Sequence, residues 1–155
     1  MDIELTRKID SINSLFDKSV IFEEDDESRA NWSKYICIII SGFVENAIQI
    51  IIGNYIRLHS DTATYRFALR KLTKIYNPNF EDLCQLVESF NSDWRSELDQ
   101  EAKDGVASSL NVIMSQRNLI AHGNYKQSNV TFLTLKDHFK NIIKLVAILE
   151  RLFTR

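Results

Sequence analysis

The chain has 155 residues, 45% of them hydrophobic and 26% charged, a balance that is ordinary for a globular domain and excludes a disordered chain. One proline and four glycines leave little material for turns, so we expect long helices and few connections. The net charge of −2 excludes binding to nucleic acid through overall charge, and any positive surface for that purpose must be local.

The first residues, "MDIELTRKID", have alternating charges and no apolar core, so we expect no signal peptide and a cytoplasmic location. Apolar residues at helical spacing then predict an amphipathic first helix. An acidic run over 23–27 predicts a solvated loop, so residues 1–28 are expected to form an N-terminal helix and an acidic loop. The apolar positions of the helix are Leu5, Ile9, Ile12 and Phe16.

A second, much more apolar helix is predicted from Asn31, which is suited to cap it. Its apolar residues cover much of the circumference, so this helix should be central. Glu45 and Asn46 interrupt the apolar run and leave it too short for a membrane helix. Cys37 and Cys84 form no CxxC pair and indicate buried thiols of a reducing compartment. The apolar positions are Trp32, Tyr35, Ile36, Ile39, Ile40, Phe43, Val44, Ala47, Ile48, Ile51, Ile52 and Tyr55.

The middle of the chain predicts two further helices and one ambiguous stretch. Helical spacing runs over 62–76 and ends before "NPN", after which Asn79 is placed to cap a fourth helix. Residues 91–105 mix features of a loop and a short helix. We expect Trp94 in that stretch, and also Trp32, in the core or at an interface. The apolar face of the fourth helix comprises Phe80, Leu83, Leu86, Val87 and Phe90.

A helix that leads into "SQRNLIAHGN" (115–124) and a final helix complete the expected fold. Gly123 suits the left-handed position that follows many helices. Thr134, with Asp137 three residues later, resembles a capping box for the last helix. We find no repeat or linker and predict an all-α helical bundle with a single domain over 1–155. The last helix carries Leu135, Phe139, Ile142, Ile143, Val146, Leu149 and Phe153.

Arg117 and His122, at the end of the second-last helix, are the main functional signal in the sequence. On an ideal helix five positions rotate by about 500°, so the two side chains point about 140° apart. Two arrangements could bring such side chains to one substrate. The helix could unwind at His122, or a second copy of the helix could face the first in a two-fold dimer.

The pair suits phosphate chemistry, because arginine offers a charged, planar fork to phosphate oxygens and histidine can carry a proton near neutral pH. His59, His122 and His138 show no ligand spacing with one another or with cysteine, so we expect neither a metal nor another cofactor. On spacing alone the commoner explanation is structural, with Arg117 as a salt-bridge partner and His122 as a helix cap. An arginine five residues before a histidine also occurs often by chance.

The stretch "RNLIAHG" resembles the RxxxxH signature of HEPN (higher eukaryotes and prokaryotes nucleotide-binding) domains, and the polar Asn118 after the arginine also fits. The stretch "ISGFVENAIQIIIGNYI" resembles the GFxE helix of the RiboL-PSP branch, with Gly42, Phe43 and Glu45 in register. A final helix after an "HGNxxxS"-like loop is similar as well. The resemblance covers residues 31–153, which is the part of the domain that it supports best.

The resemblance implies a bundle that dimerises through its motif helices and acts as a metal-independent endoribonuclease in a toxin–antitoxin or antiviral-defence system. It implies Arg117 and His122 as the catalytic pair and Asn118 as a supporting polar residue. Glu45 would orient the site or hold the fold. The implied reaction is attack of a ribose 2′-OH on the adjacent phosphate, so the substrate is RNA. An antitoxin or defence-complex protein is an implied partner, and a membrane is not.

Two basic stripes at i, i+4 and i+8 provide further candidate contacts. Such stripes are usually solvated faces, and the functional alternative is a track for the RNA backbone. Tyr125, three residues after His122, could stack on a base or cover the helix end. The stripes are Arg66, Arg70 and Lys74, and Lys136, Lys140 and Lys144.

Two functional hypotheses of different classes remain from the sequence. One is a HEPN ribonuclease, which the presence of Arg117, Asn118 and His122 favours. The other is a catalytically silent HEPN module that dimerises or binds a partner, which the negative net charge favours. A helical subunit of an unrelated complex is a third and weaker alternative.

Overall fold

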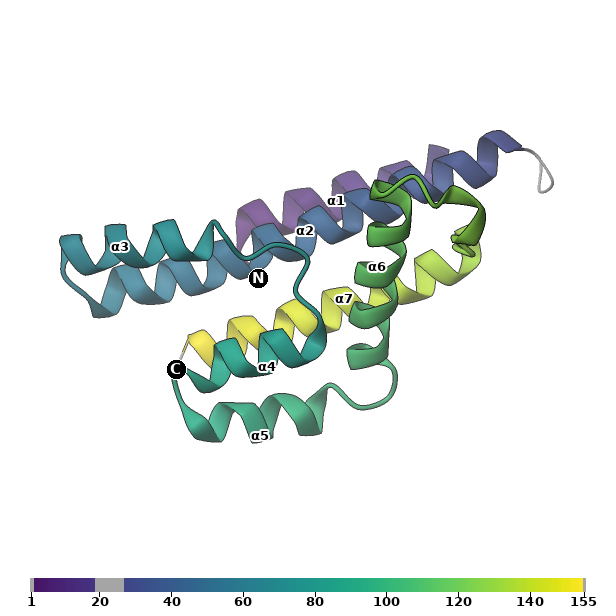
Figure 1. The fold of residues 1–155 in the computed structure, drawn as a ribbon. Helices are drawn as coiled ribbons and strands as arrows, with labels where there is room; N and C mark the ends of the chain where they lie inside the picture. Colours follow the sequence, from purple (N-terminus) through teal and green to yellow (C-terminus); the bar gives the residue numbers. More distant parts are fainter. Residues whose placement is uncertain (1, 19–26, 155) are drawn as a thin grey trace.

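The computed structural model describes residues 2–18 and 27–154, and all regular secondary structure in that part of the chain is helical (Figure 1). This confirms the predicted all-α bundle. The elements are the α-helices α1 (Ile3–Lys18), α2 (Glu27–His59), α3 (Thr62–Leu72), α4 (Phe80–Glu88), α5 (Ser92–Glu101), α6 (Val106–Ala121) and α7 (Phe132–Phe153), with one 3₁₀ turn, η2 (Tyr125–Gln127).

The long helix α2 is the centre of the bundle, as its sequence predicts, and it packs against α1, α3, α6 and α7. Tyr35 departs from the predicted apolar set, because 46% of its surface is exposed. By length and composition alone α2 could cross a membrane, but 61% of its most apolar window is buried inside the protein, as in a core helix.

Helix α1 is amphipathic, and its buried side chains are the four that the sequence spacing indicates. It runs along α2 and also contacts α7. The indole of Trp32 in α2 donates its Nε1–H to the carbonyl of Leu15 at 3.0 Å, which joins the two helices. Trp32 is partly buried against the core, in agreement with its predicted role.

Helix α2 begins earlier than predicted. It starts at Glu27, so Asn31 lies inside the helix and is not its N-cap. A tertiary contact supports the additional turn, because the Arg29 guanidinium lies 5.1 Å from the centre of the Phe132 ring. Of the predicted acidic loop, residues 23–26 lie outside the described residues, whereas Glu27 belongs to the helix.

Helix α3 ends at Leu72, four residues before the predicted end at Tyr76. The chain then turns ahead of Pro78. Asn77, the residue before the proline, takes a left-handed conformation with φ of 52°, outside the geometry of a right-handed helix. Lys74 consequently lies beyond the helix, so the first predicted basic stripe is not continuous along one helix.

Asn79 caps α4 as predicted and forms a reciprocal capping box with Asp82. The ambiguous stretch 91–105 contains the regular helix α5, which Asn91 caps. Trp94 of this helix is buried among aromatic rings of α2 and α7. Packing in the folded protein therefore selects the helix where the local sequence is ambiguous.

Helix α7 begins at Phe132 and is capped by Thr131, so the predicted capping box of Thr134 and Asp137 is wrong. Thr134 is instead the third residue of a box that starts one turn earlier, where its hydroxyl accepts the Thr131 N–H at 3.1 Å. This leaves Asp137 free to pair with Lys140 at 2.9 Å.

Candidate functional site at the end of helix α6

Helix α6 carries the motif, and its first half is fixed in the core. Leu110 and Ile113 are buried, as is the side chain of Ser109. The Ser109 hydroxyl lies 3.0 Å from Nδ1 of His138 and accepts a hydrogen bond from Nδ2 of Asn141 at 2.9 Å. Apolar packing and this polar cluster together fix α6 against α7.

The helix keeps its hydrogen bonding as far as His122, whose N–H donates to the Asn118 carbonyl at 3.0 Å. Gly123 then takes a left-handed φ of 77°, which confirms the predicted helix ending. Its N–H donates to Ile120 at 3.2 Å, and the N–H of Asn124 reaches back to the last turn. The helix ends at Ala121, and His122 is its C-cap with φ of −91° and ψ of 11°, so the chain leaves helical geometry at His122. Because the His122 N–H keeps its helical hydrogen bond, an angle of about 140° remains a fair description of the two side-chain directions within one chain.

The motif side chains have few partners in the part of the chain that the structure describes. Asn118 and His122 are exposed, and Arg117 is half-buried. Arg117 reaches only the Oδ1 atom of Asn118, at 3.4 Å, and no described carboxylate pairs with it. His122 occupies the C-cap position through its backbone, while its ring has no hydrogen-bonding partner among the described residues. The salt-bridge explanation of Arg117 therefore finds no support.

Asn118 also lines a groove of about 560 Å³ between α6 and the segment that joins α3 to α4. Across this groove the Oδ1 atom of Asn111 accepts the Phe80 N–H at 2.8 Å, which holds the start of α4 to α6. The walls are polar and, apart from Glu81, uncharged. We name this the α6 groove, and its lining residues are Asn77, Asn79, Phe80, Glu81, Asn111, Met114, Ser115 and Asn118.

The GFxE residues of α2 serve different purposes. Phe43 is buried in the core. The Oε1 atom of Glu45 accepts the Asn77 N–H at 2.6 Å, so this carboxylate holds the segment that forms one wall of the α6 groove. No described hydrogen bond or ion pair joins Glu45 to Arg117. Of the two implied roles, the geometry of Glu45 fits the one that holds the fold.

A second groove, of about 600 Å³, is lined by the segment that follows α6 and by the start of α2. Tyr125 in η2 is 54% exposed there, and the Lys34 ammonium lies 5.8 Å from the centre of its ring. The ring is thus partly exposed and next to a cation, which fits contact with a ligand, and both predicted roles of Tyr125 stay predictions. The lining residues are Glu27, Asn31, Lys34, Gly123, Asn124, Tyr125, Lys126 and Gln127.

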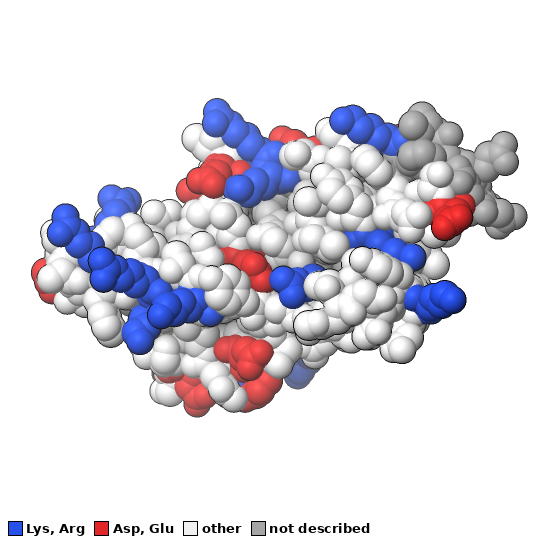
Figure 2. Space-filling model, turned by 45° about the horizontal axis from the view of Figure 1, so that its top comes forward, with Lys and Arg blue, Asp and Glu red and all other residues white. Residues whose placement is uncertain are grey.

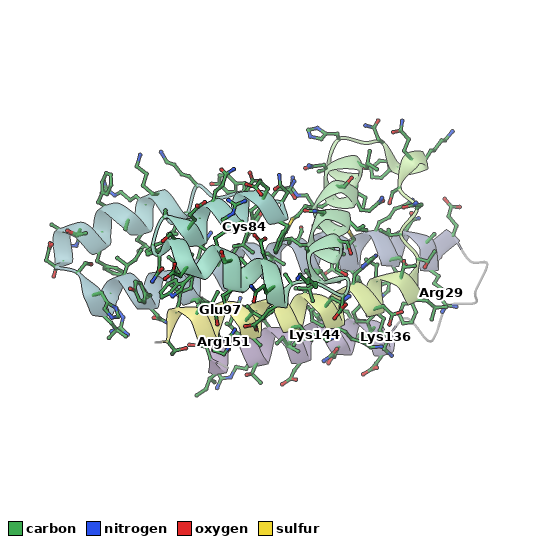
Figure 3. The ribbon with its side chains drawn as sticks, turned by 90° about the horizontal axis from the view of Figure 1, so that it is seen from below. Arg29, Cys84, Glu97, Lys136, Lys144 and Arg151 are labelled. Atoms are coloured by element: carbon green, nitrogen blue, oxygen red, sulfur yellow. The ribbon has the colours of Figure 1, made fainter. Side chains whose placement is uncertain are left out.

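The two basic stripes lie on different elements and in different surroundings. Arg66 and Arg70 project from α3, and blue side chains line that end of the molecule (Figure 2). Lys136 and Lys144 lie along α7 (Figure 3), and between them Lys140 pairs with Asp137. The structure does not bring either stripe into contact with Arg117 or His122 through any described bond.

The two cysteine thiols are protonated and unreactive near neutral pH. Burial raises the pKa of the Cys37 thiol to about 12. Burial, and then the hydrogen bond to Asp99, raise the pKa of Cys84 to about 12. Both cysteines are buried and free, as predicted, and neither supplies a thiolate near neutral pH. Among residues 2–18 and 27–154, no group of three His, Cys, Asp or Glu side chains could hold a metal ion.

Two features of the site were missed from the sequence. The α6 groove depends on the packing of the turn after α3 beside α6, and the local pattern indicated that turn but not its neighbour. Lys34 did carry a signal, because it is the single lysine or arginine between residues 30 and 56. A lone cation in so apolar a helix marks a place where the helix meets solvent or a ligand.

In a comparison with known families, the chain matches the RiboL-PSP-HEPN family over residues 3–155. The match includes α1 and the motif helix. No curated protein and no solved structure matches the chain. The match spans essentially the whole chain, and the helical architecture agrees with it. This protein therefore belongs to the RiboL-PSP-HEPN family.

Proposed function

We propose that this protein is a metal-independent endoribonuclease whose catalytic residues are Arg117 and His122, with Asn118 in support. HEPN domains are often ribonucleases. The observation that carries the proposal is the exposure of the motif side chains and their small number of partners. Its arginine and histidine lie at an exposed helix end, without the carboxylate or hydrogen-bonding partners among the described residues that a structural role requires.

The proposed reaction is an intramolecular phosphoryl transfer within RNA. His122 takes the proton from a ribose 2′-OH, whose oxygen forms a bond to the adjacent phosphorus. The bond from phosphorus to the 5′-oxygen breaks, and that oxygen receives a proton from a histidine acting as general acid. Arg117 stabilises the additional negative charge on the phosphate oxygens. The products are a 2′,3′-cyclic phosphate and a 5′-hydroxyl.

We further propose that the active form is a homodimer. Because His122 follows the last residue of α6 and keeps the hydrogen bond of that helix to Asn118, the two motif side chains of one chain point in widely different directions. A second copy placed across the motif helix supplies the missing side chain. Gly42 supports this arrangement. It lies eight residues after Lys34 on the same face of α2, it is exposed, and a Cβ atom added to it meets nothing within 4 Å.

A glycine inside a helix costs roughly 0.5–1 kcal/mol relative to alanine. Among the described residues nothing requires glycine at position 42, whereas close approach of a second copy would. Gly42→Ala should therefore leave the fold intact and weaken the dimer. Gly42→Trp should leave the helical circular dichroism unchanged but produce monomers by light scattering. A Gly42→Trp protein that remains fully dimeric and active would place the dimer interface elsewhere.

The proposed activity is tested with purified protein and a single-stranded RNA in the presence of EDTA. We expect cleavage to survive the chelator and to yield the cyclic phosphate and 5′-hydroxyl ends. A substrate with deoxyribose at the cleaved position should resist. Cleavage that is lost with EDTA and restored by a divalent ion contradicts the metal-independent mechanism.

We propose a toxin or an antiviral-defence effector as the biological setting of this ribonuclease. Expression of the wild-type protein should arrest growth, and expression of His122→Ala should not. If both proteins arrest growth equally, or the wild type neither arrests growth nor cuts RNA, the alternative of a catalytically silent dimerisation or partner-binding module is favoured.

A further inference from the structure

Helix α3 and the end of α2 form a hairpin that extends beyond the end of α7 (Figure 1). The packed side of α3 consists of Tyr65, Ala68, Leu69 and Leu72, and α2 is its principal neighbour. The opposite side faces solvent. We name this solvent side the arm face, and it consists of Arg66, Phe67, Arg70 and Lys71, all exposed.

The arm face is unusual in charge. Residues 46–80 contain five lysines and arginines and one acidic residue, a net charge of +4 in a chain whose net charge is −2. The acidic residue, Asp61, is already engaged, because its carboxylate accepts the N–H groups of Ala63 and Thr64 at the start of α3. No cation of this stretch forms an ion pair with a described residue. The arm therefore carries a net positive charge, whereas basic and acidic side chains are mixed over the rest of the face that Figure 2 shows.

Exposed aromatic rings accompany these cations. Phe67 is 65% exposed, and the Lys71 ammonium lies 5.5 Å from the centre of its ring. Tyr76, just beyond the helix, is 70% exposed. The informative feature is the combination of exposed rings and cations on one surface, because single-stranded RNA is held by cations on its phosphates and aromatic rings beneath its bases.

The arm also connects to the motif. The chain that leaves α3 passes Tyr76 and reaches Asn77, whose N–H is fixed by Glu45. Asn77 lines the α6 groove, and the opposite wall of that groove holds Asn118, next to Arg117. A strand lying on the arm face can therefore continue through a polar groove to the motif.

We propose that the arm face is a docking surface for single-stranded RNA and guides the strand along the α6 groove to the motif. The cations of the arm bind the phosphates, and Phe67 stacks on a base. The inference rests on the proposed function, because the bound RNA is a substrate only if the protein is a ribonuclease. Charge complementarity selects a polyanion, and the exposed rings select one whose bases are unpaired.

The test measures binding of fluorescein-labelled oligouridine of about 16 nucleotides by fluorescence anisotropy, as a function of salt concentration. All proteins carry His122→Ala, so that RNA is bound and not cut. The arm variant combines Arg66→Gln, Arg70→Gln and Lys71→Gln. A charge-matched control combines Arg7→Gln, Lys18→Gln and Lys103→Gln, three exposed cations outside both basic stripes.

The arm variant should weaken binding at least about tenfold and reduce the slope of log K against log salt by about 2, for three phosphate contacts to a single strand. The charge-matched control should change affinity less than about twofold. Phe67→Ala should weaken binding at least about fivefold without changing the salt slope, because stacking releases no counterions. All substituted residues are exposed, so the circular dichroism should not change.

If the arm variant and the control lose equal amounts of RNA affinity, binding depends on overall charge and not on the arm face, and the inference is overturned. It is likewise overturned if no RNA binds, if phosphatidylglycerol vesicles bind through the arm while RNA does not, or if Phe67→Ala binds like its parent. If the wild type cleaves RNA but the arm variant binds RNA as well as its parent, the docking surface is refuted and the proposed ribonuclease is not. If the arm variant loses RNA binding but the wild type does not cleave RNA, the proposed ribonuclease is refuted and the docking surface is not.

Discussion

The two ends of helix α6 both carry polar residues, and the protein holds them in opposite ways. At the buried end Ser109 contacts the ring of His138. At the exposed end the ring of His122 has no described partner, and Arg117 reaches only Asn118. A buried polar group must be hydrogen-bonded because its desolvation is costly, whereas an exposed one remains available to a ligand. The hydrogen-bonding partners of a histidine therefore indicate whether it serves the fold or is available for catalysis, more than its place in a motif does.

Substitution of the two histidines tests this comparison directly. His122→Ala should lower RNA cleavage by about 10²–10⁴, the contribution of a positioned proton carrier. Its stability should change by no more than about 0.5 kcal/mol, because the ring is exposed. His138→Ala should instead lower stability and leave the cleavage rate of the folded protein close to wild type. Cleavage assays and urea unfolding measure both effects, and the reverse pattern would exchange the two roles.

The apolar part of the buried end should be the most costly to disturb for folding. Leu110 is fully buried, so Leu110→Ala removes methyl groups from a packed core and should lower the free energy of unfolding by about 2–5 kcal/mol. Below the unfolding transition the variant should still cleave RNA. A stability close to wild type in urea unfolding would show that the two ends of α6 do not differ in packing.

Arg117 should behave like His122 in activity, with a smaller effect. Arg117→Ala should lower cleavage by about 10²–10³, as for removal of a preorganised charge. Arg117→Lys should restore only part of the rate, because a point charge cannot hold two phosphate oxygens as a guanidinium does. Gel filtration and circular dichroism check that both proteins remain folded. Full rescue by lysine would argue for charge alone and against bidentate binding.

The smallest effect concerns pH. Burial lowers the pKa of His138, and the neighbouring Asp137 opposes that shift. The unfolded chain therefore binds more protons than the folded protein as the pH falls below 6.5, so stability should decrease there and be fully present above it. His138→Gln should reduce this dependence in urea unfolding measured across that range. An unchanged pH dependence would mean that His138 is not the responsible group.

Local patterns predicted the helices well where burial and spacing agree. The buried residues of α1 are the four expected from spacing, and the ends of α4 and α6 follow from Asn79 and Gly123. The boundaries that failed depend on distant contacts. Helix α2 extends to Glu27, beside a contact with Phe132, and α7 starts at the earlier of two suitable threonines.

The sequence by itself determined the fold class, the family resemblance and the identity of the motif residues, because helical periodicity and capping depend on neighbours along the chain. Only the tertiary structure decided which polar residues have partners. It shows Glu45 holding the turn at Asn77, and Phe67 exposed among cations. It also shows that α6 ends at Ala121, with His122 as its C-cap. Burial and hydrogen bonding between residues far apart in the chain arise only when the helices pack, so no local pattern could reveal them.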